Sequence, residues 1–264
     1  MARRIVLTSG KGGVGKTTIS ANLGYALANL KQRVVILDVD IGLNNLDVVL
    51  GMENRIVFDI VDCIEGKCRL KQALVQDLTN PFLYILPSSQ NLNSSHISIS
   101  SIKFIVDELS DMFDYILIDC PAGIDIGFHR AVFSANEALL ITTPHISALK
   151  DADKVLDILS TYNLDNIGLI INRTRGDLIA SQEMASIKTI ADLFSIDLVG
   201  VLPEDDVITT TLCYGGAIKK KSKVLCAFEM LANNIHCGTR DIYTDEKKYK
   251  GLFGYLKRNL KKSI

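Results

Sequence analysis

A glycine-rich stretch at residues 10–18 carries the most specific chemistry in the chain. It follows the apolar run Ile5-Val6-Leu7 and precedes apolar residues at helical spacing, which is the order strand, turn, helix. The stretch fits G-x-x-x-x-G-K-[ST] at every fixed position. Glycines let backbone N–H groups turn toward an anion, and the start of a helix adds partial positive charge. The pattern predicts a loop that binds nucleotide phosphates, and the alternative is a turn that binds nothing.

The polar side chains of this loop have separate expected tasks. Lys16 is expected to lie on the β- and γ-phosphates, the Thr17 hydroxyl on Mg²⁺, and Thr18 near the α-phosphate. The loop residues predicted to bind the nucleotide are Gly10, Lys11, Gly12, Gly13, Val14, Gly15, Lys16, Thr17 and Thr18.

Carboxylates follow two runs of apolar residues that are typical of buried parallel strands. Residues 34–37 lead into Asp38-Val39-Asp40, and residues 115–118 lead into Asp119. Open α/β sheets bind ligands at the carboxyl ends of their strands. An aspartate at such an end, downstream of a phosphate loop, is expected to hold Mg²⁺ directly or through water. The predicted metal residues are Thr17, Asp38 and Asp119, although Asp38 and Asp40 could also be a solvated turn or a helix cap.

The remaining chain alternates short apolar runs with amphipathic helical patterns. No Pro/Gly/Ser-rich linker and no internal repeat interrupts them as far as residue 238. We therefore predict one doubly wound α/β domain over residues 1–238, with a mostly parallel sheet. Further strands are expected at 83–86, 137–143, 167–173 and 198–202, and helices at 102–113, 146–162 and 224–235, with two short helices in 56–75.

Composition narrows the class of protein. The 264 residues have a net charge of −1, so no overall basic bias favours a specific nucleic-acid partner. The six cysteines form no C-x-x-C and no zinc spacing, and we expect reduced thiols in a cytosol-like compartment. Cys120 is interpreted as a small buried residue rather than a nucleophile. No apolar stretch is long enough to span a bilayer.

The composition changes after Gly238, and residues 239–264 are predicted to be a linker and a basic amphipathic helix. Apolar residues in 245–264 share one helical face and lysines surround it, which is typical of a helix at an anionic membrane surface. Alternatively, this helix packs on its own domain, or the lysines form a disordered, solubilising end. The residues predicted to contact the membrane are Tyr249, Leu252, Phe253, Leu256, Lys257, Arg258 and Leu260.

The loop has a second lysine, Lys11, which an ordinary phosphate loop does not need. The string K-G-G-V-G-K-T-T resembles the deviant Walker A motif of the MinD/ParA ATPases. The similarity continues through D-x-D-I-G-L-x-N-L-D, L-Y-I-L-P-x-S-Q and V-G-V-L-P-E-D, and is strongest to the division-site-determining branch of the family. Asn44 and His145 depart from the common pattern of that branch.

The resemblance implies an ATPase that uses ATP and Mg²⁺ and dimerises when ATP is bound. The implied catalytic residues are Lys11, Lys16 and Asp40: Lys11 reaches the partner's nucleotide, and Asp40 orients the attacking water. Asn172 is implied to hydrogen-bond the adenine, although a plain strand-end turn residue is an alternative. The implied loop against the base is Pro203, Glu204 and Asp205.

The same resemblance implies partners and a location. They are a homodimer, an anionic membrane surface, a MinE-like activator and a MinC-like inhibitor. The implied place is peripheral, on the inner membrane face of a bacterial cytoplasm or a plastid stroma. A ParA-type DNA-segregation ATPase, a reductase like the nitrogenase iron protein, and a nucleotide-binding scaffold without activity are the alternatives.

Overall fold

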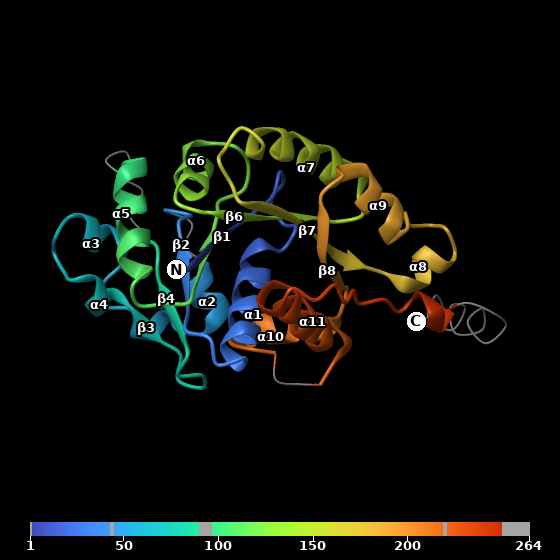
Figure 1. The fold of residues 1–264 in the computed structure, drawn as a ribbon. Coiled ribbons are helices and arrows are strands. Elements are labelled where there is room, and N and C mark those ends of the chain that lie inside the picture. The colour runs from blue at the N-terminus through green and yellow to red at the C-terminus, as the bar shows by residue number, and fades with distance from the viewer. Residues whose placement is uncertain (1, 43–44, 90–96, 219–220, 250–264) are drawn as a thin grey trace.

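A single eight-stranded sheet forms the centre of the molecule (Figure 1). The computed structural model describes residues 2–42, 45–89, 97–218 and 221–249. Within these residues the strand order is β3-β4-β2-β5-β1-β6-β7-β8, and only the β3–β4 pair is antiparallel. The strands are β1 (Arg3–Thr8), β2 (Val34–Asp38), β3 (Val75–Gln76), β4 (Leu83–Leu86), β5 (Tyr115–Asp119), β6 (Glu137–Thr142), β7 (Asn166–Thr174) and β8 (Asp197–Pro203).

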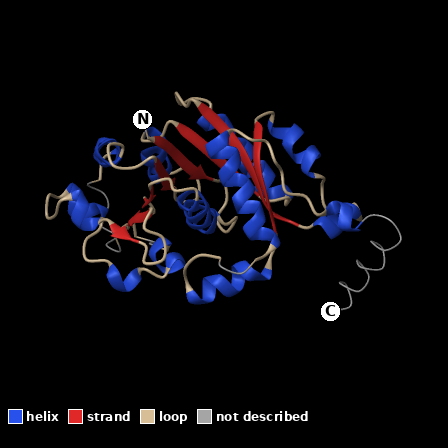
Figure 2. Cartoon of the chain, turned by 60° about the horizontal axis from the view of Figure 1, so that its bottom comes forward, coloured by secondary structure: helices blue, strands red, loops and turns tan. Residues whose placement is uncertain are grey.

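Helices cover both faces of the sheet, as Figures 1 and 2 show. One face packs against α1, α2 and α11, and the other against α5, α6, α7 and α9. The predicted doubly wound, mostly parallel α/β fold is therefore confirmed. The helices are α1 (Lys16–Asn29), α2 (Leu46–Leu50), α3 (Ile60–Ile64), α4 (Leu70–Ala73), α5 (Ile99–Leu109), α6 (Ile126–Phe133), α7 (Ile146–Leu159), α8 (Gly176–Ala180), α9 (Ile187–Phe194), α10 (Asp206–Tyr214) and α11 (Lys223–Cys237), with 3₁₀ turns η1 (Glu53–Arg55) and η3 (Glu246–Tyr249).

The central strand β1 shows how the sequence builds two cores. Its side chains alternate, so Ile5 and Leu7 join the cluster with α1 and α11, while Val6 joins the opposite cluster. All three side chains are essentially buried. A strand buried on both faces is held rigidly, and the loop that follows it therefore starts from a fixed position.

The strands that carry the predicted carboxylates end beside β1. In the parallel register, Leu7 of β1 is opposite Asp119 of β5, and Asp119 is opposite Asp38 of β2. After β1 the chain continues to β2, β3 and β4, which lie on one side of β1 in the sheet. The later strands β6, β7 and β8 lie on the other side of β1. The carboxyl end of β1 is thus the place where the strand order reverses, which is where open α/β sheets bind ligands.

Described residues that follow Gly238 also pack against the domain. The Asn234 side-chain amide donates to the carbonyl oxygens of Val199 (2.9 Å) and Asp241 (2.8 Å), which ties the following segment to β8. Tyr243 then packs against the core, and Tyr249, only 8% exposed, is buried where η3 meets α8.

The burial of Tyr249 corrects its assignment to a membrane-facing stripe, because a buried side chain cannot contact lipid. The other predicted membrane residues lie outside the described residues; they are Leu252, Phe253, Leu256, Lys257, Arg258 and Leu260. Among the helices that the structure describes, none is both long enough and apolar enough to cross a bilayer.

Candidate nucleotide-binding site

The loop between β1 and α1 passes very close to neighbouring elements. Gly13 (φ 78°) and Gly15 (φ 101°) have left-handed backbone conformations that favour glycine. A Cβ atom on Gly15 would lie 2.7 Å from Nδ2 of Asn172, and one on Gly10 would lie 2.1 Å from the carbonyl oxygen of Asp151. Two of the loop glycines are therefore required by contacts with β7 and α7, in addition to any ligand.

The start of α1 presents backbone donors to the loop. Gly15 precedes the helix, and no side chain caps this end. The first intrahelical hydrogen bond runs from the Ile19 N–H to the Gly15 carbonyl at 2.9 Å. The N–H groups of the first turn and the positive end of the helix dipole are thus directed at the loop, as an anion site requires.

Lys16 places a positive charge beneath this loop. The residue is only 8% exposed, and its Nζ donates to the Ser9 hydroxyl at 3.1 Å. The Ser9 hydroxyl in turn donates to the Lys11 carbonyl at 3.0 Å. A buried ammonium is costly without an anionic partner. The arrangement fits the predicted role of Lys16 as a phosphate ligand.

Asp38 and Asp119 form a buried pair at the ends of β2 and β5. Their side chains are 1% and 3% exposed. Burial raises the pKa of Asp119 to about 6, although hydrogen bonds from Thr17 and Ser20 oppose this rise. Burial and the neighbouring Asp119 charge raise the pKa of Asp38 well above its usual value. Two buried carboxylates repel each other, so this pair favours a bound cation.

The residues present fit a Mg²⁺ site of the kind found with nucleotides. Thr17 lies close enough to Asp119 to lower the pKa of its carboxyl group, so two of the three predicted metal residues are neighbours. In the described part of the chain, no three His, Cys, Asp or Glu side chains converge to hold a metal by themselves. Mg²⁺ commonly takes one or two protein ligands and completes its shell with water and phosphate. The Thr17–Asp119 arrangement matches that habit.

Asp40 lies partly buried beside the phosphate loop. Burial raises its pKa, and the nearby charge of Lys16 opposes the rise. Its backbone N–H donates to the Asp38 carboxylate at 2.9 Å. The turn after β2 therefore directs Asp40 toward Lys16, while Asp38 stays in the sheet.

Lys11 points out of the loop that contains Lys16. It is exposed, and its Nζ donates to the Ser147 hydroxyl at the start of α7, 3.1 Å away. The two lysines of the motif thus occupy different environments: Lys16 is buried inside the site, and Lys11 lies at the surface.

Asn172 contacts the phosphate loop itself. It is buried at the end of β7, and its Nδ2 donates to the Val14 carbonyl at 2.7 Å. The Arg173 N–H donates to its side-chain oxygen at 2.9 Å. The residue is therefore more than a solvated turn at a strand end, and its predicted contact with adenine stays a prediction.

The segment after β8 is fixed next to the same strand end. The Glu204 N–H donates to the Thr174 carbonyl at 3.0 Å, immediately after Pro203. Asp205 accepts from the Val207 N–H at 3.1 Å and thereby caps α10. The structure brings this segment beside the end of β7, but it gives the Asp205 carboxylate a structural task.

Three serines that the motif analysis did not single out support the site: Ser9 under Lys16, Ser20 on Asp119 at 2.9 Å, and Ser147 on Lys11. Ser20 could have been found, because it lies one helical turn after Thr17 on the same face of α1. Ser147 is 136 residues from Lys11, and no local pattern connects them.

Cys120 follows Asp119 and is 2% exposed. Burial raises the pKa of its thiol to about 12, which keeps it protonated at neutral pH. The interpretation of Cys120 as a small buried residue is thus in agreement with its environment.

The sequence matches a known family over most of its length. The family model described as the CobQ/CobB/MinD/ParA nucleotide binding domain matches residues 5–217. The chain is similar to the septum site-determining protein MinD of Bacillus subtilis, with 42% identity over 261 residues and 97% of each chain covered.

Solved structures lead to the same family. The chain resembles the MinC:MinD cell division protein complex of Aquifex aeolicus with a TM-score of 0.84, 37% identity and coverage of 92% of this chain and 99% of that one. It also resembles MinD of Pyrococcus horikoshii complexed with Mg-ADP, with a TM-score of 0.81, 33% identity and coverage of 89% and 96%. The chain therefore belongs to the CobQ/CobB/MinD/ParA nucleotide-binding family, as one of its MinD septum site-determining members.

Proposed function

We propose that this chain is an ATP-driven switch that helps to place the division septum. The observation that carries the proposal is the convergence of Lys16, Thr17 and the buried Asp38–Asp119 pair at the carboxyl end of β1. One end of the site is positive and the other negative, which is complementary to a phosphate chain with its magnesium. The relatives reported above are MinD proteins, so septum placement is favoured over DNA segregation.

In this proposal the protein groups bind the nucleotide and its Mg²⁺ and orient the water that attacks the phosphate. The N–H groups at the start of α1 and the Lys16 ammonium bind the phosphates, and Thr17 and Asp119 hold Mg²⁺. Bound Mg²⁺ neutralises negative charge on the phosphate oxygens. Asp40, beside Lys16, orients the water for hydrolysis to ADP and phosphate. The intrinsic rate is slow, because a switch must persist long enough to act.

Dimerisation would complete the site. Lys11 is exposed, and among the described residues its ammonium hydrogen-bonds only the exposed Ser147, so moving it to the phosphates of a second copy costs little. Its ammonium would stabilise the charge that develops on the transferred phosphoryl group of that copy. A homodimer with ATP is therefore part of the proposal.

The base would lie between the ends of β7 and β8. We assign the adenine contact to Asn172 and to the backbone of Pro203, Glu204 and Asp205. For Asp205 we assign the contact to the backbone, because its carboxylate already caps α10. The Asn172 amide donates to the Val14 carbonyl, so a contact between Asn172 and adenine would be linked to the position of the phosphate loop.

Membrane binding is assigned to the basic residues that follow Tyr249. Each Lys or Arg near an anionic surface contributes about 1 kcal/mol, so one short segment binds weakly. Two segments on one dimer bind far more tightly, because the second binding event is intramolecular. A MinC-like inhibitor and a MinE-like, hydrolysis-stimulating activator are the proposed protein partners. The proposed place is peripheral, on the cytoplasmic or stromal face of the membrane.

Sedimentation with anionic liposomes tests the coupling between nucleotide and membrane. With ATP most of the protein should sediment, and with ADP or no nucleotide most should stay in the supernatant. A chain truncated after Tyr249 is the matched control, because it keeps the packed domain and removes only the basic end. It should bind ATP normally and fail to sediment.

Two outcomes would contradict the proposal. Equal sedimentation with ATP, ADP and no nucleotide would remove the switch. Absence of phosphate release with ATP and liposomes would leave a nucleotide-binding scaffold instead of an ATPase.

A further inference from the structure

Two cysteines outside the nucleotide site lie in direct contact at the edge of the molecule. The sulfur atoms of Cys63, in α3, and Cys68, just before α4, are 3.4 Å apart. Both residues are partly buried, and both are free thiols. A disulfide has an S–S distance of about 2.05 Å, so the two sulfur atoms must approach each other further before a bond forms.

The turn between the two cysteines holds them in this position. Gly66, with φ 74°, ends α3 in the left-handed conformation. Its N–H donates to the Cys63 carbonyl at 3.1 Å, and the Lys67 N–H donates to the Asp62 carbonyl at 2.9 Å. This pair of bonds is the Schellman arrangement, which reverses the chain directly after a helix. The reversal brings Cys68 back over Cys63.

The far side of the pair is fixed as well. The backbone N–H of Arg69 donates to the Gln72 side chain at 2.9 Å, which starts α4, and Leu70 and Ala73 are buried in the core. Both cysteines therefore stand next to anchored helices. A disulfide there would join two side chains that are already in contact.

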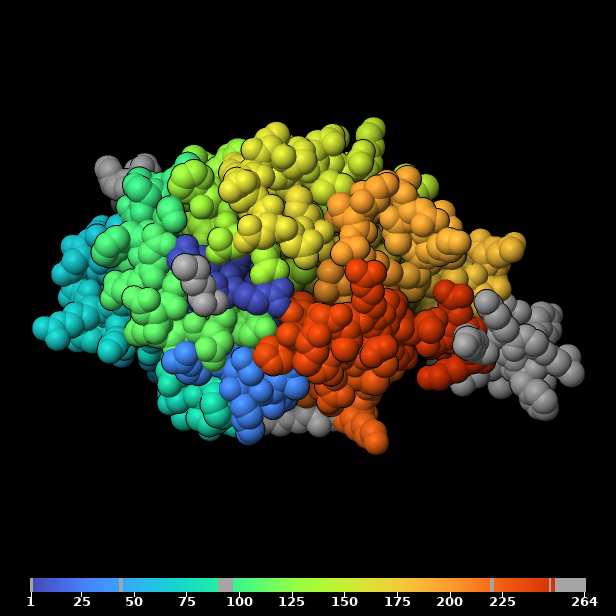
Figure 3. Space-filling model, viewed as in Figure 1, coloured from blue at the N-terminus to red at the C-terminus, as the bar shows by residue number. Residues whose placement is uncertain are grey.

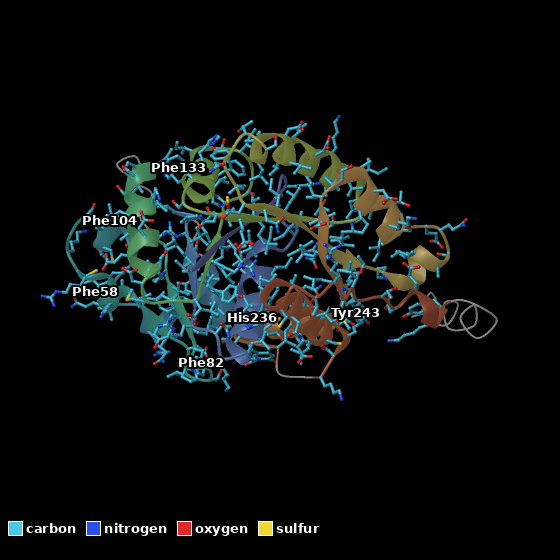
Figure 4. The ribbon with its side chains drawn as sticks, in the orientation of Figure 1. Phe58, Phe82, Phe104, Phe133, His236 and Tyr243 are labelled. Atoms are coloured by element: carbon cyan, nitrogen blue, oxygen red, sulfur yellow. The ribbon has the colours of Figure 1, made fainter. Side chains whose placement is uncertain are left out.

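The pair lies in the wall of an open surface pocket of about 740 Å³. Arg69 and Lys71 line it, and Glu108 is the one acidic side chain in its lining. Phe104 of α5 lines the other side and is 67% exposed (Figure 4). A small molecule that carries carboxylates can therefore reach the two sulfur atoms, and the basic side chains favour its approach.

We propose that Cys63 and Cys68 are a modification site at which a reversible disulfide forms by exchange with a small anionic disulfide of the oxidised-glutathione class. This proposal does not depend on the nucleotide site, because neither cysteine belongs to it.

The reaction balances as two successive thiol–disulfide exchanges. The Cys68 thiolate attacks one sulfur of oxidised glutathione, and a glutathione thiolate leaves and takes up a proton. The Cys63 thiol then loses its proton and attacks the Cys68 sulfur, which releases the second glutathione thiol. Two protein thiols are oxidised and one glutathione disulfide is reduced.

The two cysteines have different surroundings. Burial and the contact with Cys68 raise the pKa of Cys63 to about 12, so Cys63 stays protonated at neutral pH. The first attack is assigned to Cys68, which directly precedes the pocket-lining Arg69, and Cys63 resolves the mixed disulfide.

Peptide mapping after incubation in glutathione redox buffers tests the proposal. Lys67 lies between the cysteines, so trypsin separates them unless a disulfide joins the two fragments. We expect a linked fragment in oxidising buffer that disappears in reducing buffer, and about tenfold more of it than of the glutathione adduct at Cys68. The full chain is used, with circular dichroism to verify that it stays folded.

Two variants separate a preorganised pair from a chance contact. Gly66→Ala keeps both cysteines but disfavours the left-handed turn, and the Cβ has open space around it. It should lower the equilibrium yield of the linked fragment about fivefold or more. Cys226→Ser removes an exposed cysteine elsewhere and should leave the yield unchanged.

Three results would overturn the proposal. One is glutathione addition at the exposed Cys213 under conditions in which Cys63 and Cys68 stay reduced or carry only glutathione. Another is linkage of either residue mainly to a different cysteine. The last is a Gly66→Ala yield equal to that of the unchanged chain, since the turn would then play no part.

Discussion

The two ends of the central strands differ in how their charged side chains are paired. At the amino end, Arg3 of β1 forms a two-pronged ion pair with Glu137 of β6, at 2.7 and 2.6 Å. The Tyr115 hydroxyl of β5 bonds the His236 ring at 2.9 Å. At the carboxyl end of the same strands, the aspartates of β2 and β5 are neighbours of like charge.

This difference separates stability from function. At the amino end, opposite charges meet in a hollow of about 600 Å³, where Figure 3 shows the first residues of the chain in dark blue. These charges satisfy one another and help to hold β1 to its neighbours. At the carboxyl end, Asp38 and Asp119 are buried next to each other, which is unfavourable for two carboxylates, and a bound cation would relieve their repulsion. Sites that bind ligands commonly keep such strain, because binding then releases it.

The largest expected effect is the loss of Lys16. Lys16→Ala removes the buried ammonium, and nucleotide affinity should fall about a thousandfold, as for two or more charge-assisted hydrogen bonds. Isothermal titration calorimetry measures this change. Lys103→Ala, which alters an exposed surface ion pair on α5, is the control and should bind normally. Retained affinity in Lys16→Ala would exclude this lysine from the phosphate site.

Asp40→Ala should affect hydrolysis and spare binding. If Asp40 orients the attacking water, phosphate release falls about a hundredfold while ATP affinity stays within a small factor. A steady-state assay of phosphate release, with the affinity measured in parallel, separates the two quantities. A turnover rate equal to that of the unchanged chain would remove Asp40 from this role.

Asp119→Asn tests whether the carboxyl end is strained without its ligands. The substitution removes one of two adjacent buried acidic groups, both with raised pKa values, and keeps an oxygen that can accept from Ser20. Without Mg²⁺ and nucleotide, the free energy of unfolding should rise by about 1–2 kcal/mol. The stabilisation by Mg-nucleotide should shrink. Urea denaturation with and without these ligands measures both changes, and a less stable ligand-free variant would contradict the comparison.

Glu137→Gln should give the smallest effect of the four substitutions. It should lower the free energy of unfolding, whereas Asp119→Asn should raise it. It breaks the partly exposed pair with Arg3, so stability should fall by about 1 kcal/mol, and less in high salt. Nucleotide affinity should stay unchanged, because the substitution is at the other end of the strands. A loss of affinity would show that the two ends are coupled.

The phosphate loop and the buried strands could be predicted because their signals are local. Spacing of glycines, a lysine and a threonine specifies the loop, and apolar runs specify the strands. The contacts of Lys11 with Ser147 and of Asn172 with Val14 could not be predicted this way, because they join elements that only the fold brings together.

The packing of residues beyond Gly238 could not be predicted for the same reason. Gly238 follows the last amphipathic helix, and the charged residues beyond it suggested a separate tail. The structure continues instead, because Asn234 binds the returning chain and Asp245 packs against Gly176, where a Cβ would lie 1.9 Å from the carboxylate. Similarly, Cys63 and Cys68 match no cysteine motif, and only the turn at Gly66 brings them together.

The close approach of Gly10 to α7 has a mechanical consequence. No room exists there for even one methyl group, since it would overlap the Asp151 carbonyl. A side chain at position 10 would push α7 away from the sheet and move Ser147 with it. The spacing between this loop and α7 therefore depends on the absence of a side chain at residue 10.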